Sequence, residues 1–260
     1  MKHLNTYITE YIVKKKLDKP INSEDHYKYF PKTKNNLIDN IIELLDNGET
    51  NFNCIDTSNI TDMSKLFYHE NFEEINFDVS NWNVSNVTNM NHMFIFCENF
   101  DCDLSKWDVS NVKDMGSTFD NCHNFKGKGL ENWDVSNVAN MRHMFYSCIN
   151  FNYDLSNWNV SKVENMSNMF SGCEIFEGKG LENWDVSNVT NTNHMFQYCK
   201  QFTGKALENW NVSNVKYMDY MFSFCKQLDC DLSKWDVSNV KNMHNMFYNC
   251  NSLKNIPKWY

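Results

Sequence analysis

The sequence contains no long hydrophobic segment. Its longest run of apolar residues covers five positions, 93–97, whereas a membrane-spanning helix needs about 20. Residues 1–16 include no apolar stretch followed by a small-residue cleavage site, so we expect no secretory signal. These absences predict a soluble, cytoplasmic protein that neither spans nor binds a membrane.

The common motifs of catalysis and cofactor binding are also missing. The chain has no C-x-x-C or C-x-x-H spacing, no H-E-x-x-H, no Gly-rich phosphate loop and no nucleophile motif. A catalytic site would require polar residues that depart from the regular pattern described below, and we find no such cluster. We therefore expect a protein that is not an enzyme and that holds no cofactor and no metal.

The chain also lacks an excess of positive charge. It carries 24 Lys and Arg against 33 Asp and Glu, a formal charge of −9. Residues 1–50 are balanced, so the whole negative charge belongs to residues 51–260. A negative protein repels nucleic acid and anionic membrane surfaces. We expect no nucleic-acid partner.

Tryptophan recurs through the chain at almost constant spacing. The eight residues are Trp82, Trp107, Trp133, Trp158, Trp184, Trp210, Trp235 and Trp259. Successive steps of 24 to 26 residues indicate a solenoid of stacked turns. A diverged first turn begins at Ile55, which makes eight turns, and a ninth starts at Trp259.

Each turn has two halves with different apolar spacing. The first half is L-x-x-W-x-V, as in Leu104, Trp107 and Val109, and its alternation is typical of a strand. The second half is M-x-x-M-F-x-x-C, as in 141–148, and its i, i+3, i+4, i+7 spacing predicts a short helix with one apolar face. The expected fold class is therefore α/β, a leucine-rich-repeat-like solenoid of 25- to 26-residue strand-plus-helix turns.

Polar residues recur in register as well. An Asp or Asn precedes the M-x-x-M-F-x-x-C segment in every turn except the seventh, where Tyr217 stands, and we expect this column to N-cap the predicted helices. The Ser and Asn of W-D-V-S-N-V form two further columns, which we assign to bonding backbone groups where the chain bends. The Asp and Asn that follow each Trp are expected to form a solvated face.

The cysteines and histidines follow the repeat too. Seven of the ten cysteines form one inward column and are expected to be core thiols, namely Cys97, Cys122, Cys148, Cys173, Cys199, Cys225 and Cys250. Cys102 and Cys230 share another column about 24 Å apart, beyond the reach of a disulfide. His92, His143 and His194 fall on alternate turns about 10 Å apart, too far to share a metal ion.

The repeat resembles a known family. DLSKWDVSNVKDM and NWDVSNVANMRHMFYSC are similar to the WDVSNVTNM-type repeats of the BspA-like leucine-rich-repeat family, and the similarity covers about residues 55 to 255. The resemblance implies a curved stack of strand and helix turns that serves adhesion or protein interaction. The segment before the repeats also resembles members encoded by gut bacteria and their phages, which leaves a phage protein in host cytoplasm or a virion as an open alternative.

The residues before the repeats are expected to cap the stack. Thr33 can N-cap a helix whose apolar residues include Leu37 and Ile41, with Gly48 at its C-terminal end. A second amphipathic stretch near 4–13 could join it. We therefore divide the chain into a helical N-terminal cap, 1–54, and a repeat solenoid, 55–260, and such caps prevent edge pairing in solenoids.

The positions that vary between turns are the candidates for function, because the fold already explains the positions that repeat. Several of them carry aromatic residues near the last Phe and Cys of a turn, and exposed aromatic side chains anchor protein interfaces. The candidate partner-binding residues are Phe96, Tyr198, Tyr217, Tyr220 and Phe224. Packing of these side chains against the neighbouring turn is the rival explanation.

The sequence thus favours a non-enzymatic scaffold for protein–protein interaction, whose partner binds the late turns, about 195 to 250. The alternative is a structural component of a virion or cell surface, which would assemble or adhere. In that case self-association through the C-terminal edge is expected, since 251–260 contain no second cap.

Overall fold

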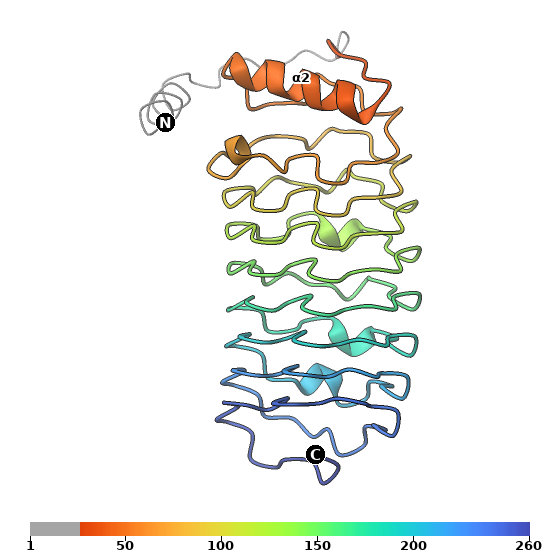
Figure 1. Ribbon diagram of the computed structural model, residues 1–260, viewed down its shortest axis with the longest axis vertical. Helices are drawn as coiled ribbons and strands as arrows, with labels where there is room; N and C mark the ends of the chain where they lie inside the picture. Colours follow the sequence, from red (N-terminus) through yellow and green to blue (C-terminus); the bar gives the residue numbers. More distant parts are fainter. Residues whose placement is uncertain (1–26) are drawn as a thin grey trace.

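The computed structural model describes residues 27–260, which form a repeat solenoid (Figure 1). Its one α-helix in that range is α2 (Lys34–Asp46), and four short 3-10 helices follow. These are η1 (Glu70–Phe72), η2 (Leu130–Asn132), η3 (Leu181–Asn183) and η4 (Lys205–Leu207). The turns stack along the long axis, with α2 at one end and the C-terminus at the other (Figure 1).

Identical apolar side chains from successive turns stack in the core. The rings of Phe119 and Phe145 lie 5.7 Å apart and nearly parallel, as do those of Phe145 and Phe170. The Trp column stacks similarly, with 6.3 Å between the ring centroids of Trp158 and Trp184. Offset stacking at such distances is favourable for aromatic rings. The repeated sequence therefore builds one continuous core from ladders of like residues.

Backbone hydrogen bonds join each turn to the next along the M-x-x-M-F-x-x-C segment. In the fourth turn the amides of Met141, His143, Phe145 and Ser147 donate to carbonyls of the fifth turn at 2.7 to 3.0 Å. Only every second amide takes part, and the amides between them bond within their own turn, as Met144 N does to the Met141 carbonyl. An isolated parallel bridge opens each such segment, for example Asn140 with Asn165.

The prediction of a helix in the M-x-x-M-F-x-x-C segment was wrong. The segment is a chain of turns, in which His143 and Ser147 have left-handed φ angles of 57° and 55°. The predicted inward residues are nevertheless correct, since Met141, Met144, Phe145 and Cys148 are fully buried. The helix fails because its amides would have to bond four residues back, whereas every second one bonds to the neighbouring turn.

The prediction of a strand at L-x-x-W-x-V was also wrong, although its apolar residues are buried as expected. Trp107 N donates to the Leu104 carbonyl, which closes a turn instead of extending the chain. The indole Nε1 of each Trp bonds to a carbonyl of the preceding turn, as Trp133 does to Leu104 O at 3.3 Å. Trp259 does the same to Leu232 O at 2.9 Å, so the predicted ninth turn has begun.

The polar columns satisfy backbone groups, as predicted. Asn140 Oδ1 accepts from the amide of Arg142 at 3.1 Å, so this column caps a turn and not the helix that we predicted. In the seventh turn, where Tyr217 replaces Asn, the side chain of Asn193 in the preceding turn accepts from Asp219 N. The Asn of W-D-V-S-N-V donates to the Ser carbonyl of the preceding turn, as Asn188 does to Ser161 O at 2.7 Å.

Helix α2 has the predicted capping residues. Thr33 Oγ1 accepts from Asn36 N at 3.2 Å. After Asn47, Gly48 takes a left-handed φ of 77°, and Glu49 N donates to the Leu44 carbonyl, a Schellman end. Leu37, Ile41 and Leu44 are buried, while Ile42 is exposed. The second predicted amphipathic stretch, 4–13, lies outside the described residues.

The helix and the segment before it are joined to the first turn. Lys34 Nζ bonds to Ser64 Oγ at 2.8 Å and to Asp62 Oδ2 at 3.3 Å. The chain before α2 pairs with the first turn through a parallel bridge between Tyr29 and Ile55. These contacts attach α2 to the end of the stack on which it lies (Figure 1).

The ten cysteines are free thiols, and eight of them are buried. The thiol of Cys148 donates to the Phe119 carbonyl of the preceding turn at 3.0 Å. Four other buried cysteines of its column make the equivalent bond at 2.9 to 3.0 Å, namely Cys122, Cys173, Cys199 and Cys225. Burial raises the pKa of Cys102 and Cys230 to about 12. These two thiols are therefore protonated at neutral pH. Of the seven column cysteines predicted to be core thiols, six are buried and Cys250 is half-buried.

The stacked core predicts unequal costs for two substitutions in neighbouring columns. Trp133→Ala removes a ring that is 2% exposed and should lower the free energy of unfolding by roughly 3 to 5 kcal/mol, because a cavity remains. Cys148→Ala removes only one small group and should cost much less. Urea unfolding of both variants checks this. Negligible losses in both would contradict the assignment of the core.

The raised thiol pKa values predict slow alkylation of the folded protein. At pH 8, a thiol with a pKa of about 12 is ionised on the order of once in ten thousand molecules, and only the thiolate reacts. We expect iodoacetamide to modify all ten cysteines in guanidinium chloride but few in the native state, beginning with the half-buried Cys54, whereas a pKa of about 12 keeps the half-buried Cys250 slow. Mass spectrometry counts the adducts. Rapid native modification of Cys148 would show that its column is accessible.

Candidate partner-binding face

Two columns of residues in the M-x-x-M-F-x-x-C segments are at least partly exposed, apart from Ser117, which is buried. The first, which we name the His column, consists of Lys65, His92, Ser117, His143, Asn168, His194, Tyr220 and Asn245. The second, which we name the pre-Cys column, consists of Phe96, Asn121, Ser147, Gly172, Tyr198, Phe224 and Asn249. Every member has a left-handed φ, between 53° and 79°. Because this geometry recurs in each turn, it belongs to the fold, and only the identity of the side chains varies.

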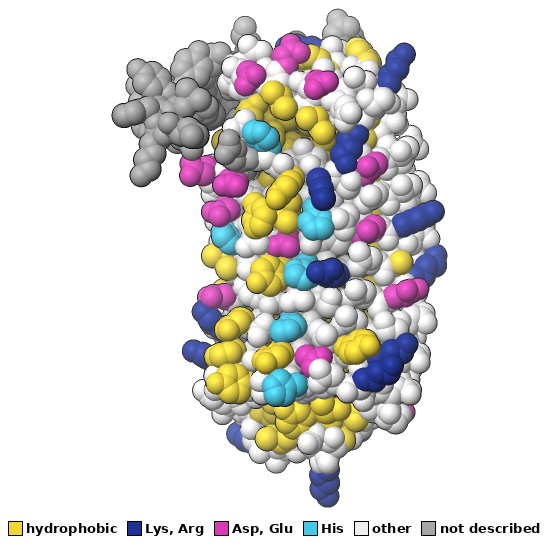
Figure 2. All heavy atoms as spheres, in the orientation of Figure 1, with side chains coloured by type: hydrophobic (Ala, Val, Ile, Leu, Met, Phe, Trp, Pro, Cys, Tyr) yellow, Lys and Arg dark blue, Asp and Glu magenta, His cyan; other side chains and the backbone are white. Residues whose placement is uncertain are grey.

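Hydrophobic and His side chains gather along one face of the stack (Figure 2). In the late turns, the ring of Tyr198 lies 4.6 Å from that of Phe224 and almost parallel to it. Phe224 in turn meets Tyr248 edge-on at 5.4 Å. Tyr198 is 42% exposed and Tyr248 is 51% exposed. The three rings form an aromatic cluster that is held by stacking and open to solvent.

A recess of about 480 Å³ adjoins this cluster. It spans the fourth to seventh turns, and its lining includes Tyr146, Ser147, Gly172, Tyr198 and Phe224. Lys200 and Glu174 form an ion pair of 2.6 Å at its rim. The recess thus combines aromatic walls with charged groups, the mixture that ligand and peptide sites use.

The structure places the five predicted site residues at four separate locations. Tyr198 and Phe224 lie together in the aromatic cluster. Tyr220 stacks on His194 at 4.9 Å, is only half-exposed and has its hydroxyl bonded by Asn245. Tyr217 is 39% exposed but does not line the recess.

Phe96, the fifth predicted residue, is far from the others along the stack. It belongs to the second turn, four turns before Tyr198, and its ring lies 6.3 Å from that of Tyr68. Packing against the neighbouring turn, the rival explanation of these aromatics, therefore holds in part for Tyr198, Phe224 and Phe96. Each of them contacts the ring of an adjacent turn, and Tyr198 and Phe96 remain about 40% exposed.

Of the residues that line the recess, the predicted site residues include only Tyr198 and Phe224, and one of those missed is Gly172. It occupies the pre-Cys column between Ser147 and Tyr198, and it is the one glycine in that column. The signal was present in the alignment of the turns, where Gly172 is the position at which the variable column loses its side chain. Exposed aromatics attract attention in a sequence, whereas the space beside them becomes visible only in the structure.

The histidines of the face make polar contacts with side chains. His143 Nδ1 lies 3.7 Å from a carboxylate oxygen of Asp120, which is 7% exposed. Burial lowers the pKa of His92. Within residues 27–260, no group of three or more His, Cys, Asp or Glu side chains is arranged to hold a metal ion.

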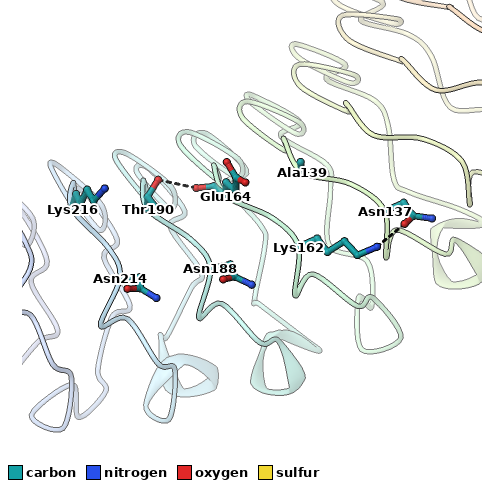
Figure 3. A pocket seen from close by; sticks show the side chains of 8 residues that line it. All are labelled: Asn137, Ala139, Lys162, Glu164, Asn188, Thr190, Asn214 and Lys216. Atoms are coloured by element: carbon teal, nitrogen blue, oxygen red, sulfur yellow. Dashed lines mark hydrogen bonds between the residues drawn. The ribbon is translucent and has the colours of Figure 1, made fainter.

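A second recess, of about 600 Å³, lies at the bend after W-D-V-S-N-V (Figure 3). Its lining is polar, and includes Asn188, Asn214 and Lys216. Thr190 bonds to the Glu164 carbonyl at 3.2 Å, and Lys162 bonds to Asn137 at 2.7 Å. Asn188 and Asn214 belong to a repeating ladder, whereas Lys162, Glu164, Thr190 and Lys216 vary between turns. None of the lining residues is an aromatic anchor, so the aromatic cluster is the better candidate site for a protein partner.

Within the described part of the chain, no helix is long and apolar enough to cross a membrane. No curated protein matches the sequence. One similar solved structure is the "Crystal structure of TLR13-ssRNA13 complex", with 10% identity and a TM-score of 0.19, which covers 78% of this chain and 45% of that one. A TM-score that low supports no conclusion, and the chain spans less than half of that protein.

The family described as "Mycoplasma protein of unknown function, DUF285" matches the chain three times, at residues 36–129, 114–206 and 172–260. The three matches overlap and run in tandem through α2 and all the repeats. They agree with the repeated stacking of Trp, Phe and Cys seen in the structure. The chain therefore belongs to the DUF285 family of repeat proteins.

Proposed function

We propose that this protein is a non-enzymatic interaction scaffold that binds a protein partner through the aromatic cluster Tyr198, Phe224 and Tyr248. The observation that carries the proposal is the exposed stack of Tyr198 on Phe224 beside a recess. Aromatic anchors next to a pocket are typical of the energetic centres of protein interfaces. The resemblance to BspA-like repeats, which serve adhesion or protein interaction, supports the same proposal.

The charge distribution supports a protein partner over a polyanion. The formal charge of −9 disfavours nucleic acid and anionic membranes. The rim of the recess, in contrast, carries Lys200 and Lys226 beside a single acidic residue, Glu174. A partner with an apolar anchor and some acidic character would complement this site.

Capture of the partner from a lysate of the source cells tests the proposal. The double variant Tyr198→Asn, Phe224→Asn removes both rings, and Asn tolerates the left-handed φ of 62° and 64° at these positions. We expect one protein to be captured by the wild type and reduced at least tenfold in the double variant, since hot-spot residues cost about 2 kcal/mol or more when truncated.

The matched control is Tyr27→Asn, which removes a Tyr that is also 42% exposed but lies before α2. It should capture as much partner as the wild type. Thermal unfolding verifies that all variants are folded. Equal capture by the double variant and the wild type would reject the aromatic cluster as the binding site.

A second candidate function is assembly into a larger structure through the last turn. Val240 and Met243 of the eighth turn are half-buried, whereas their counterparts Val215 and Met218 in the seventh turn are buried. Light scattering over a range of concentrations separates the two candidates. The interaction scaffold predicts a constant mass near 30.9 kDa. A mass that rises with concentration, and that Met243→Asp returns to one chain, would favour assembly instead.

A further inference from the structure

The pre-Cys column contains an empty position next to the aromatic cluster. Going along the stack, its side chains are those of Ser147, Gly172, Tyr198 and Phe224, one per turn. Gly172 contributes backbone but no side chain. A Cβ built there would lie 3.1 to 3.4 Å from atoms of Ser147, closer than ordinary contact, so the backbone of Gly172 packs tightly against the preceding turn. Outside this backbone contact, the row of side chains in the pre-Cys column lacks one member, and we call this space the gap over Gly172.

The ring of Tyr198 borders this gap with one of its faces. Its other face is covered by Phe224, since the two rings are stacked with an interplanar angle of 16°. Phe224 belongs to the turn that follows Tyr198, and Gly172 belongs to the turn that precedes it. The uncovered face of Tyr198 is therefore directed along the stack toward Gly172. The recess of about 480 Å³ is lined by residues of the same turns, including both.

Within the core, the same solenoid shows what fills such a space. Rings of successive turns stack at 5.3 to 5.8 Å in the column that runs from Phe67 to Phe247. Tyr198 and Phe224 stack in the same way on the surface, from one turn to the next. A flat ring over Gly172 would extend the surface stack by one member. It would stack on the free face of Tyr198 with a lateral offset, a favourable arrangement of aromatic rings.

Charge at the rim adds a second requirement on the ligand. Lys200 and Lys226 both line the recess, and Lys226 is exposed. Glu174 pairs with Lys200 at 2.6 Å, which leaves one positive charge in excess at the rim. An acidic residue beside the inserted ring would complement it, and a basic residue would be repelled.

We propose that the gap over Gly172 is a binding site for one aromatic side chain of the partner, stacked on Tyr198 and followed by an acidic residue that approaches Lys226. This inference rests on the proposed function and specifies the partner's chemistry: an exposed peptide segment with an aromatic–acidic pair. The partner's ring fits only over Gly172, because every other member of the pre-Cys column, from Phe96 to Asn249, carries its own side chain.

Short peptides test the site on the full chain. The probes are three capped tetrapeptides, Gly-Trp-Glu-Gly, Gly-Leu-Glu-Gly and Gly-Trp-Lys-Gly, titrated into ¹⁵N-labelled protein. We expect the amide signal of Gly172 to shift on addition of the first peptide, with an affinity about threefold to tenfold higher than that of the Leu peptide, the range that ring stacking adds. The Lys peptide should also bind more weakly. Equal affinities for the Trp and Leu peptides would overturn the proposal.

Variants at Tyr198 and Gly172 distinguish ring stacking from non-specific hydrophobic binding of the peptide. Tyr198→Phe keeps the flat ring and should bind the Trp peptide as the wild type does, whereas Tyr198→Asn should lose at least tenfold in affinity. Gly172→Asn fills the gap and should abolish binding. Asn is chosen because Asn121 and Asn249 occupy the same column with φ of 60° and 57°. Unchanged binding by a folded Gly172→Asn variant would show that the gap is not the site.

The partner itself distinguishes failure of this inference from failure of the proposed function. If Tyr198→Asn loses the captured partner and Gly172→Asn keeps it, the aromatic cluster binds the partner but the gap does not, and the inference is wrong alone. If both variants lose it, the gap is occupied in the complex. If Gly172→Asn fails to fold, the peptide comparison on the wild type and the Tyr198 variants still decides the outcome.

Discussion

The structure depends on the hydrogen bonds that the alternate amides of each M-x-x-M-F-x-x-C segment donate to the next turn. An amide that bonds to a neighbouring turn cannot also bond four residues back, so the segment cannot be a helix. Residues such as His143 and Ser147 take left-handed φ angles instead, a conformation that is costly for residues other than glycine. The cost recurs along the stack and is offset by a continuous ladder of hydrogen bonds and by the burial of the inward apolar side chains, four of which are fully buried in the fourth turn.

Side-chain ladders reinforce the same register. Trp Nε1 reaches a carbonyl of the preceding turn, the Cys thiol reaches another, and the Asn of W-D-V-S-N-V reaches a third. The carbonyls that accept from Trp and Cys already accept a backbone amide of their own turn, as Leu130 O does from Trp133 N, so the side chain adds a second bond from the following turn. These side-chain bonds therefore favour stacking between turns of the same sequence pattern. This mutual dependence explains why the repeat is so uniform and why the core contains ladders of identical residues.

Among the positions that vary between turns are the left-handed residues of the His column and the pre-Cys column. The side chains of the pre-Cys column lie outside the buried core, so the repeat does not constrain them and they vary among Phe, Asn, Ser, Gly and Tyr. The candidate site arises where two aromatics, Tyr198 and Phe224, occur in consecutive turns and a glycine precedes them. Neighbouring turns bring residues 25 or 26 apart in the sequence into ring contact, so the site is assembled by the stacking and not by any local motif.

The sequence by itself determined the number of turns, their period and the identity of the buried residues. It determined both ends of α2 as well, through the N-cap at Thr33 and the turn at Gly48. It also pointed to Tyr198 and Phe224, because exposed aromatics at variable positions are conspicuous. Only the tertiary structure decided the conformation of each turn and the grouping of the site. The reason is that i, i+3, i+4, i+7 burial is shared by a helix and by this chain of turns, and the choice between them depends on whether the amides bond locally or to the neighbouring turn. That choice is non-local, as is the gap over Gly172, which exists only between two turns.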